Sequence, residues 1–311
     1  MESELVSIII PTYNRGEILP FTLQSVLKQT SSSWECLIVD DGSTDGTKHL
    51  IQQYLKDPRF IYIQRPTTRK KGAATCRNIG LENAKGNFIQ YLDSDDTIAQ
   101  NKIEVHSELL KNESPLCLAT CKWGRFYVKS KKVVVHEKMP TYFSTNKPME
   151  LLNIFGNMSS YLPIHNYFIP IQLSNIAGKW NENLSNNDDG EYFTRIFLNC
   201  DKVKFTRRTH VLYRAGTSER ISNLENRKNI QSYILGWKLI DEHLEIRGYP
   251  KHTTVKYAAR NLFTKLKETV FKDLLTEHQL FFNKKRSLSE HLILKFFGKA
   301  KIWKPFRKFS A

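Results

Sequence analysis

The sequence lacks the long apolar run that a membrane-spanning helix requires. Such a helix needs about 18 to 20 predominantly apolar residues, and no stretch of the 311-residue chain approaches that length. The first residues are acidic, and the apolar run over residues 5–10 is too short for a secretory signal peptide. We therefore expect a cytoplasmic protein, either free or bound peripherally to the cytoplasmic face of a membrane.

Paired cysteines are also missing. The chain has five cysteines, an odd number, and no CxxC pair. Disulfide frameworks and structural zinc sites usually show paired cysteines at short spacings. We therefore expect reduced, structural thiols at Cys36, Cys76, Cys117, Cys121 and Cys200.

Glycine-rich phosphate-binding loops are absent from the expected places. Neither GxGxxG nor GxxxxGK[ST] occurs where a strand would lead into a helix. Those loops hold phosphates on backbone N–H groups at a helix N-terminus. A diphosphate bound to this chain would therefore need other positive charge, from a metal ion or from basic side chains.

The first hundred residues alternate between apolar strands and helical patterns. We expect strands over 6–10, 34–39, 60–63 and 88–92, and helices between them. This order predicts an α/β fold with a mostly parallel, twisted, Rossmann-like sheet that is flanked by helices. The first strand is expected to end at Pro11, because proline cannot donate to a sheet ladder.

The pattern changes after residue 100. A hairpin is expected over 116–136, a helix over 190–199, and two strands over 203–206 and 210–213. Beyond Ser218 the pattern is entirely helical. We therefore divide the chain into an α/β domain, 1–221, and a helical C-terminal extension, 222–311.

Positive charge is concentrated at the C-terminal end. The net charge is +16, and residues 284–311 contain nine Lys and Arg against one Glu. Leu288, Leu292 and Phe296 recur at helical spacing among these cations. We expect a basic amphipathic segment that binds an anionic membrane surface. Packing of this face against the preceding helices is the alternative.

The strand at 88–92 ends in closely spaced carboxylates, at Asp93, Asp95 and Asp96. Open α/β sheets bind ligands at the carboxyl ends of their strands. Carboxylates this close repel one another unless a cation lies among them, and hard oxygen ligands suit Mg²⁺ or Mn²⁺. The alternative is an acidic turn that caps the next helix.

Polar residues also follow the first two strands. Residues 11–15 follow the first strand, and Asp40 and Asp41 follow the second. A carboxylate there can accept hydrogen bonds from a base or ribose, and Tyr13 offers a flat face for stacking. Arg77, or the basic loop 69–71, would help the metal to neutralise a diphosphate.

Four sequence blocks together resemble the family 2 glycosyltransferases, which have the GT-A fold. They are VSIIIPTYNR at 6–15, VDDGSTDGT at 39–47, RNIG at 77–80 and LDSDD at 92–96. The resemblance implies an inverting transferase that uses a nucleotide-diphospho-sugar, most commonly a UDP-sugar, and Mn²⁺ or Mg²⁺. The acceptor would be a glycan or a lipid-linked glycan.

The resemblance assigns roles to single residues. Asp40 or Asp41 would bind the base, and Asp93, Ser94 and Asp95 would form the DxD motif. Asp95 and Asp96 would lie nearest the metal. The residues expected to bind the nucleotide-sugar are Pro11, Thr12, Tyr13, Arg15, Asp40, Asp41, Arg77, Asp93, Ser94 and Asp95.

A further block, DDGEYFTR at 188–195, resembles the family's Glu-Asp segment. Inversion in one displacement needs a carboxylate that takes the acceptor's hydroxyl proton. Asp189 is the expected base and Asp188 the other candidate, with an acidic helix cap as the alternative. Many relatives have a His after a Tyr-Arg pair, whereas Tyr213 and Arg214 have none after them. The metal would then have fewer protein ligands.

Two other functions stay open on the sequence. A sugar nucleotidyltransferase shares the fold, the acidic pair and the metal, but it would be expected to have a glycine-rich basic loop that residues 11–15 lack. A basic nucleic-acid-binding protein is suggested by charge alone. Carboxylates clustered at the strand ends would repel its phosphates.

Overall fold

The computed structural model describes residues 4–128, 130–158, 161–216 and 224–283. The chain divides into two compact units, Met1–Thr254 and Val255–Ala311. Both the expected division at 221/222 and the basic segment 284–311 fall outside the described residues, so these two expectations stay predictions.

The first unit contains a five-stranded sheet with the order β3-β2-β1-β4-β8. Its strands are β1 (Val6–Thr12), β2 (Trp34–Asp40), β3 (Phe60–Gln64), β4 (Phe88–Tyr91) and β8 (Ile169–Pro170). All pairs are parallel except β4 with β8. β1 and β2 are buried along their whole length, as the continuous apolar runs of parallel strands require. This arrangement confirms the predicted α/β class and its mostly parallel sheet.

β1 continues through Pro11, contrary to the expectation that it would end there. The strand pairs with β2 as far as Thr12, but with β4 only as far as Ile9. Pro11 therefore lies beyond the part of β1 that β4 covers, and its missing N–H interrupts no ladder between three strands.

A second sheet has the order β5-β9-β6-β7. Its strands are β5 (Thr97–Ile98), β6 (Cys117–Tyr127), β7 (Lys132–Val135) and β9 (Lys202–Ala215). The predicted hairpin is present as β6 and β7. The two strands expected over 203–213 are one strand, and its register against β6 shifts between Cys121 and Lys122. The polar residues that separated the two expected strands form this irregularity.

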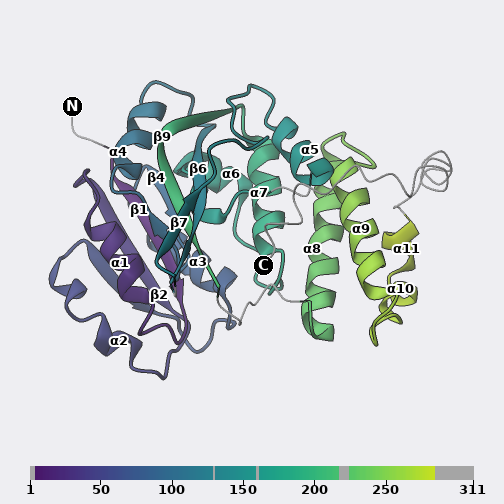
Figure 1. The fold of residues 1–311 in the computed structure, drawn as a ribbon, viewed down its shortest axis with the longest axis horizontal. Coiled ribbons are helices and arrows are strands. Elements are labelled where there is room, and N and C mark those ends of the chain that lie inside the picture. The colour runs from purple at the N-terminus through teal and green to yellow at the C-terminus, as the bar shows by residue number, and fades with distance from the viewer. Residues whose placement is uncertain (1–3, 129, 159–160, 217–223, 284–311) are drawn as a thin grey trace. The chain divides into compact units, whose positions relative to one another are not determined.

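Helices connect and flank these strands (Figure 1). In the first unit they are α1 (Leu19–Leu27), α2 (Thr47–Leu50), α3 (Ala73–Asn83), α4 (Lys102–Leu110), α5 (Met149–Met158), α6 (Ile171–Ala177), α7 (Asp188–Asn199) and α8 (Arg227–Ile246). α9 (Thr253–Leu266) starts at the end of the first unit, and α10 (Leu274–Glu277) and α11 (Gln279–Asn283) follow in the second. Within the described residues, no helix has the length and apolar character needed to cross a membrane. All five cysteines are free thiols, as expected.

The parallel sheet brings the predicted motifs to one edge. Thr12 at the end of β1 is in register with Asp40 at the end of β2, and Ile9 is in register with Tyr91 of β4. The segments that follow these three strands therefore begin beside one another, as ligand-binding loops of open α/β sheets do.

Candidate functional site

A buried guanidinium connects the two acidic segments that the sequence singled out. Arg77 lies on α3, and its side chain is 7% exposed. Its Nη2 is 2.8 Å from Oδ1 of Asp93, which follows β4, and its Nη1 is 2.7 Å from Oδ2 of Asp188, the first residue of α7. Burial lowers the pKa of Arg77, but the charges of Asp93 and Asp188 outweigh burial and raise it overall. The guanidinium also lies 4.5 Å from the ring centroid of Trp180.

Asp189 stands beside this bridge at the start of α7. Its side chain is accessible to solvent, and Oδ1 accepts a hydrogen bond of 2.8 Å from the N–H of Gly190. Many protein atoms nevertheless surround the carboxyl group. This partial loss of hydration, followed by the charge of Asp188, raises the pKa of Asp189 to about 6. An accessible carboxylate with a pKa close to neutral is suited to accept a proton.

The DxD turn carries the carboxylates of Asp93 and Asp95, and Asp93 is also paired with Arg77. Asp93 and Asp95 are both partly exposed. Burial and then the charge of Asp93 raise the pKa of Asp95, while Arg15 and Arg214 act against this. Within the described residues, no cluster of three or more His, Cys, Asp or Glu side chains could hold a metal by itself. Two carboxylates of this kind would suit Mn²⁺ or Mg²⁺ that also binds a substrate's phosphate oxygens, which is how Mg²⁺ commonly binds.

Asp96 faces the interior of the protein, unlike its neighbours. Its side chain is 1% exposed, with Oδ1 accepting a hydrogen bond from Arg214 N at 2.8 Å and Oδ2 lying 3.1 Å from Nδ1 of His165. Burial raises the pKa of Asp96 well above its usual value and lowers that of His165 to about 3. Of the two predicted metal ligands, Asp95 is thus the accessible one.

Arg214 on β9 ties the second sheet to the DxD turn. Its Nε donates to the carbonyl oxygen of Asp95 at 3.1 Å, in addition to the backbone bond to Asp96. Its guanidinium lies 5.2 Å from the ring of Phe126 on β6. The sequence did not nominate Arg214, although the Tyr-Arg pair marked its position.

Asp40 and Asp41 are both held by neighbouring side chains. Oδ1 of Asp40 accepts hydrogen bonds from N and Oγ of Ser43, at 2.8 and 2.7 Å, and Oδ2 accepts one from the Tyr62 hydroxyl. Asp41 forms an ion pair with Arg65. The sequence missed Tyr62 and Arg65, because partners from an adjacent strand leave no local signal. These contacts fix the loop after β2.

The loop after β1 exposes an aromatic ring. Tyr13 is 42% exposed, and Nζ of Lys71 lies 3.5 Å from its ring centroid. Thr12 and Pro11 are buried, and the Thr12 hydroxyl has no hydrogen-bond partner among the described residues. Arg15 is half-buried and acts electrostatically on the DxD turn. The loop therefore places a ring and a cation at the same edge of the sheet.

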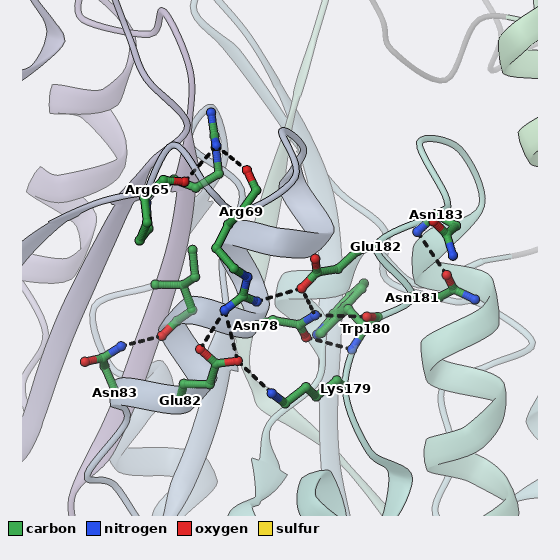
Figure 2. A network of polar contacts seen from close by, with 12 residues as sticks. Arg65, Arg69, Asn78, Glu82, Asn83, Lys179, Trp180, Asn181, Glu182 and Asn183 are labelled. Carbon is green, nitrogen blue, oxygen red and sulfur yellow. Dashed lines mark hydrogen bonds and ion pairs between the residues drawn. The ribbon is translucent and has the colours of Figure 1, made fainter.

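Most of the basic loop 69–71 is engaged in protein contacts. Arg69 pairs with Glu82 at 3.1 Å and with Glu182 at 2.7 Å, and Lys70 bonds to Asn183 at 2.9 Å. Figure 2 shows how Arg69 lies between the two glutamates, one on α3 and one on the segment before α7. The loop thus fastens the segment before α7 to α3.

Asn78 completes this connection one residue after Arg77. Its buried side chain accepts a hydrogen bond of 2.8 Å from Trp180 N and donates one of 2.9 Å to Trp180 O (Figure 2). A second donation of 2.9 Å goes to Glu182. Because Trp180 in turn lies over Arg77, the RNIG block holds both the guanidinium and the ring that covers it.

Two groups of predicted residues result. Asp93, Asp188 and Asp189 gather around Arg77, and Asp95 follows Asp93 in the DxD turn. Asp40, Asp41, Tyr13 and their partners surround the ends of β1 and β2. Asp96, the next residue of the DxD turn, is buried and contacts Arg214 and His165. Trp180 was not nominated from the sequence.

Comparison with protein families gives one match over half of the chain. The family described as Glycosyl transferase family 2 matches residues 7–168. The UDP-Glc:alpha-D-GlcNAc-diphosphoundecaprenol beta-1,3-glucosyltransferase WfgD of Escherichia coli is 42% identical over 113 residues, which are 36% of this chain and 44% of WfgD. Glycosyltransferase GlyG of Streptococcus pneumoniae serotype 4 is 37% identical over 102 residues, 33% of this chain and 34% of GlyG. The matched segments span less than half of these curated relatives.

Solved structures share the fold over most of the chain. Staphylococcus aureus TarS 1-349 in complex with UDP-GlcNAc has a TM-score of 0.63 and 18% identity, covering 90% of this chain and 79% of TarS 1-349. The mannosyltransferase PcManGT from Pyrobaculum calidifontis, in complex with GDP-Man and Mn2+, has a TM-score of 0.55 and 14% identity, covering 99% and 84%. These likenesses confirm the expected GT-A fold.

Proposed function

The chain belongs to glycosyl transferase family 2, and from this premise we propose that it is an inverting glycosyltransferase. It moves a sugar from a nucleotide-diphospho-sugar, which we expect to be a UDP-sugar, to a hydroxyl group of a glycan or lipid-linked glycan. The observation that carries this proposal is the Arg77 bridge between Asp93 and Asp188. The bridge supports the proposal because it joins Asp93, which we expect at the donor, to Asp188, the neighbour of the expected base Asp189.

The nucleotide is proposed to bind at the ends of β1 and β2. The exposed ring of Tyr13 offers a stacking face. The buried hydroxyl of Thr12, which has no partner among the described residues, lies at the end of the same strand. Asp40 and Asp41 use some of their hydrogen-bond acceptor sites for protein partners. A carboxylate has about four such sites, so each can accept further hydrogen bonds from a base or ribose.

Asp95, with Asp93 beside it, is proposed to hold Mn²⁺ or Mg²⁺. The ion would supply positive charge to the diphosphate as it leaves. Asp96 was predicted as a second ligand. Its contacts with Arg214 and His165 instead favour a role in holding the DxD turn in place.

Asp189 is proposed to act as the general base. It takes the proton from the acceptor hydroxyl while that oxygen attacks the anomeric carbon on the face opposite the nucleoside diphosphate. One carbon–oxygen bond forms, and the bond to the diphosphate breaks with its electron pair leaving on the diphosphate. The anomeric configuration therefore inverts. Asp188 is less suited to this task, because its carboxylate is already paired with Arg77.

The acceptor is proposed to be a lipid-linked sugar. The name of WfgD gives GlcNAc-diphosphoundecaprenol as the acceptor of that relative, and an acceptor of the same class would place the reaction at a membrane surface. A cytoplasmic location, with peripheral contact through residues 284–311, belongs to this proposal.

The test uses the full chain with Mn²⁺ and a panel of UDP-glucose, UDP-GlcNAc and GDP-mannose. Nucleoside diphosphate release is measured with and without a short-chain GlcNAc-diphospho-lipid, and NMR gives the anomeric configuration of the product. We expect release from a UDP-sugar that the acceptor accelerates, with inversion. Formation of a nucleotide-sugar from a nucleoside triphosphate and a sugar 1-phosphate would establish the nucleotidyltransferase alternative instead.

A further inference from the structure

The loop that precedes the proposed base is fastened to α8 through one serine. The Ser232 hydroxyl oxygen accepts hydrogen bonds from the N–H groups of Ser185 and Asn186, at 2.8 and 3.1 Å. The same hydroxyl lies 3.3 Å from the carbonyl oxygen of Asn186, to which it donates. Ser232 is buried, so it satisfies backbone groups that water would otherwise have to reach.

The next residue of the loop, Asn187, packs closely against two glycines. Asn187 has a φ of 61°, a left-handed conformation that asparagine tolerates better than most residues. A Cβ atom at Gly190 would lie 2.3 Å from Oδ1 of Asn187. At Gly236 of α8 it would lie 2.9 Å from Nδ2 and 3.3 Å from the backbone oxygen of Asn187. Glycine at both positions therefore leaves the space in which Asn187 sits.

These contacts belong to one face of α8. Ser232, Gly236 and His243 are spaced by four and seven residues, which places them on the same side of a helix. Nε2 of His243 lies 2.9 Å from Oε1 of Glu191 in the first turn of α7. Accordingly, α7 and α8 lie side by side in Figure 1.

We propose that Ser232 and Gly236 are positioning residues for sugar transfer, acting through Asn187 on Asp189. This rests on the proposed function in that Asp189 is taken as the base. Among the described residues, the side chain of Asp189 accepts a local hydrogen bond from the N–H of Gly190. The direction of its carboxylate is therefore set mainly by how the chain enters α7. Asn187 fixes that entry, and α8 fixes Asn187. α8 thus helps to position the proposed base, although it follows the division expected at residue 221.

The test compares Ser232→Ala and Gly236→Ala with two matched variants. Ser232→Thr keeps the hydroxyl group, and Leu235→Ala alters an exposed residue next to Gly236. Turnover is followed as nucleoside diphosphate release from the UDP-sugar that the wild-type chain uses, with the GlcNAc-diphospho-lipid as acceptor. Calorimetric titration with the same UDP-sugar gives the number of donor sites per chain, and a thermal scan gives Tm.

Ser232→Ala and Gly236→Ala should each lower kcat by about tenfold to a hundredfold, the scale expected when a reacting group is displaced. The KM for the donor and the number of donor sites should be retained in both variants, since none of the residues around Arg77 is changed. Tm should be retained in Gly236→Ala, because alanine favours a helix over glycine. Tm should fall modestly in Ser232→Ala and recover in Ser232→Thr, because two backbone N–H groups lose and then regain their acceptor. Ser232→Thr should recover most of the lost kcat, and Leu235→Ala should match the wild type.

Wild-type kcat in both alanine variants would overturn the proposal. Loss of donor sites or of Tm in step with kcat, without recovery in Ser232→Thr, would also overturn it, because α8 would then only support the fold. Asp189→Asn separates this outcome from failure of the proposed function. Wild-type activity in Asp189→Asn would show that Asp189 is not the base, so the proposed function would fail. If Asp189→Asn is inactive while Ser232→Ala and Gly236→Ala are fully active, Asp189 remains the proposed base. Only the positioning role of Ser232 and Gly236 is then excluded.

Discussion

Replacing Arg77 by methionine removes the charge that joins Asp93 to Asp188 and keeps a side chain of similar length. Two charge-assisted hydrogen bonds are lost, and each such bond generally contributes about 1.5 to 3 kcal/mol. The two carboxylates are 34% and 18% exposed, so water can replace part of what they lose. We therefore expect the free energy of unfolding to fall by about 2 to 3 kcal/mol, below the cost of breaking a fully buried pair. Arg77→Lys should recover less than half of this loss, because an ammonium group cannot pair with both carboxylates as the planar guanidinium fork does.

Urea unfolding followed by circular dichroism measures this loss, and calorimetry with the UDP-sugar donor measures binding. Donor binding should weaken in Arg77→Met, since Asp93 and Asp188 then carry charge without a partner and repel the diphosphate. A variant that stays within about 0.5 kcal/mol of the wild type, the usual range for a surface substitution, and binds donor equally well would refute the reasoning.

Three further predictions concern acids and a buried amide of the same site. Because partial burial and Asp188 raise the pKa of Asp189 to about 6, kcat should decline as pH falls through about 6, where the base becomes protonated. Asp188→Asn should shift that decline to lower pH, and a wild-type decline near the ordinary aspartate pKa of about 3.9 would contradict the assignment. Asp95→Asn should abolish transfer yet keep or raise Tm, since burial raises the pKa of Asp95 and an amide carries no charge; full activity of that variant in EDTA would exclude both residue and metal from the mechanism. Asn78→Ala should lower the free energy of unfolding by about 2 to 4 kcal/mol in urea, because the backbone N–H and C=O of Trp180 lose their partners, and a change under about 1 kcal/mol would show that water replaces the amide.

The parallel half of the fold was predictable because its signals are local. Apolar runs ending in turn residues gave β1, β2 and β4, and each motif lies directly after its own strand. β9 was misread as two strands, since the polar residues between Thr206 and His210 interrupt the apolar alternation without breaking the strand. Pro11 was misjudged because a sequence does not show where a neighbouring strand stops.

The sequence predicted which acidic residues belong to the site, but not how these residues are arranged around one another. Asp95 and Asp96 are equivalent in sequence, and only the position of His165 and Arg214 shows that Asp96 faces inward. The pairing of Arg77 with Asp188 depends on how α3 meets α7, which no local pattern encodes. Ser232 gave no signal either, because a serine within a helical pattern has many structural roles.

The central claim, that Asp189 activates the acceptor beside a donor held by the DxD turn, is tested most directly by Asp189→Asn. The measurement is turnover of the UDP-sugar in the presence of Mn²⁺ and the lipid-linked acceptor, together with donor affinity on the same protein. We predict that donor affinity is retained while turnover falls by roughly two to four orders of magnitude, the usual contribution of a general base. A folded Asp189→Asn variant that binds donor and turns it over at the wild-type rate would show that Asp189 is not the base.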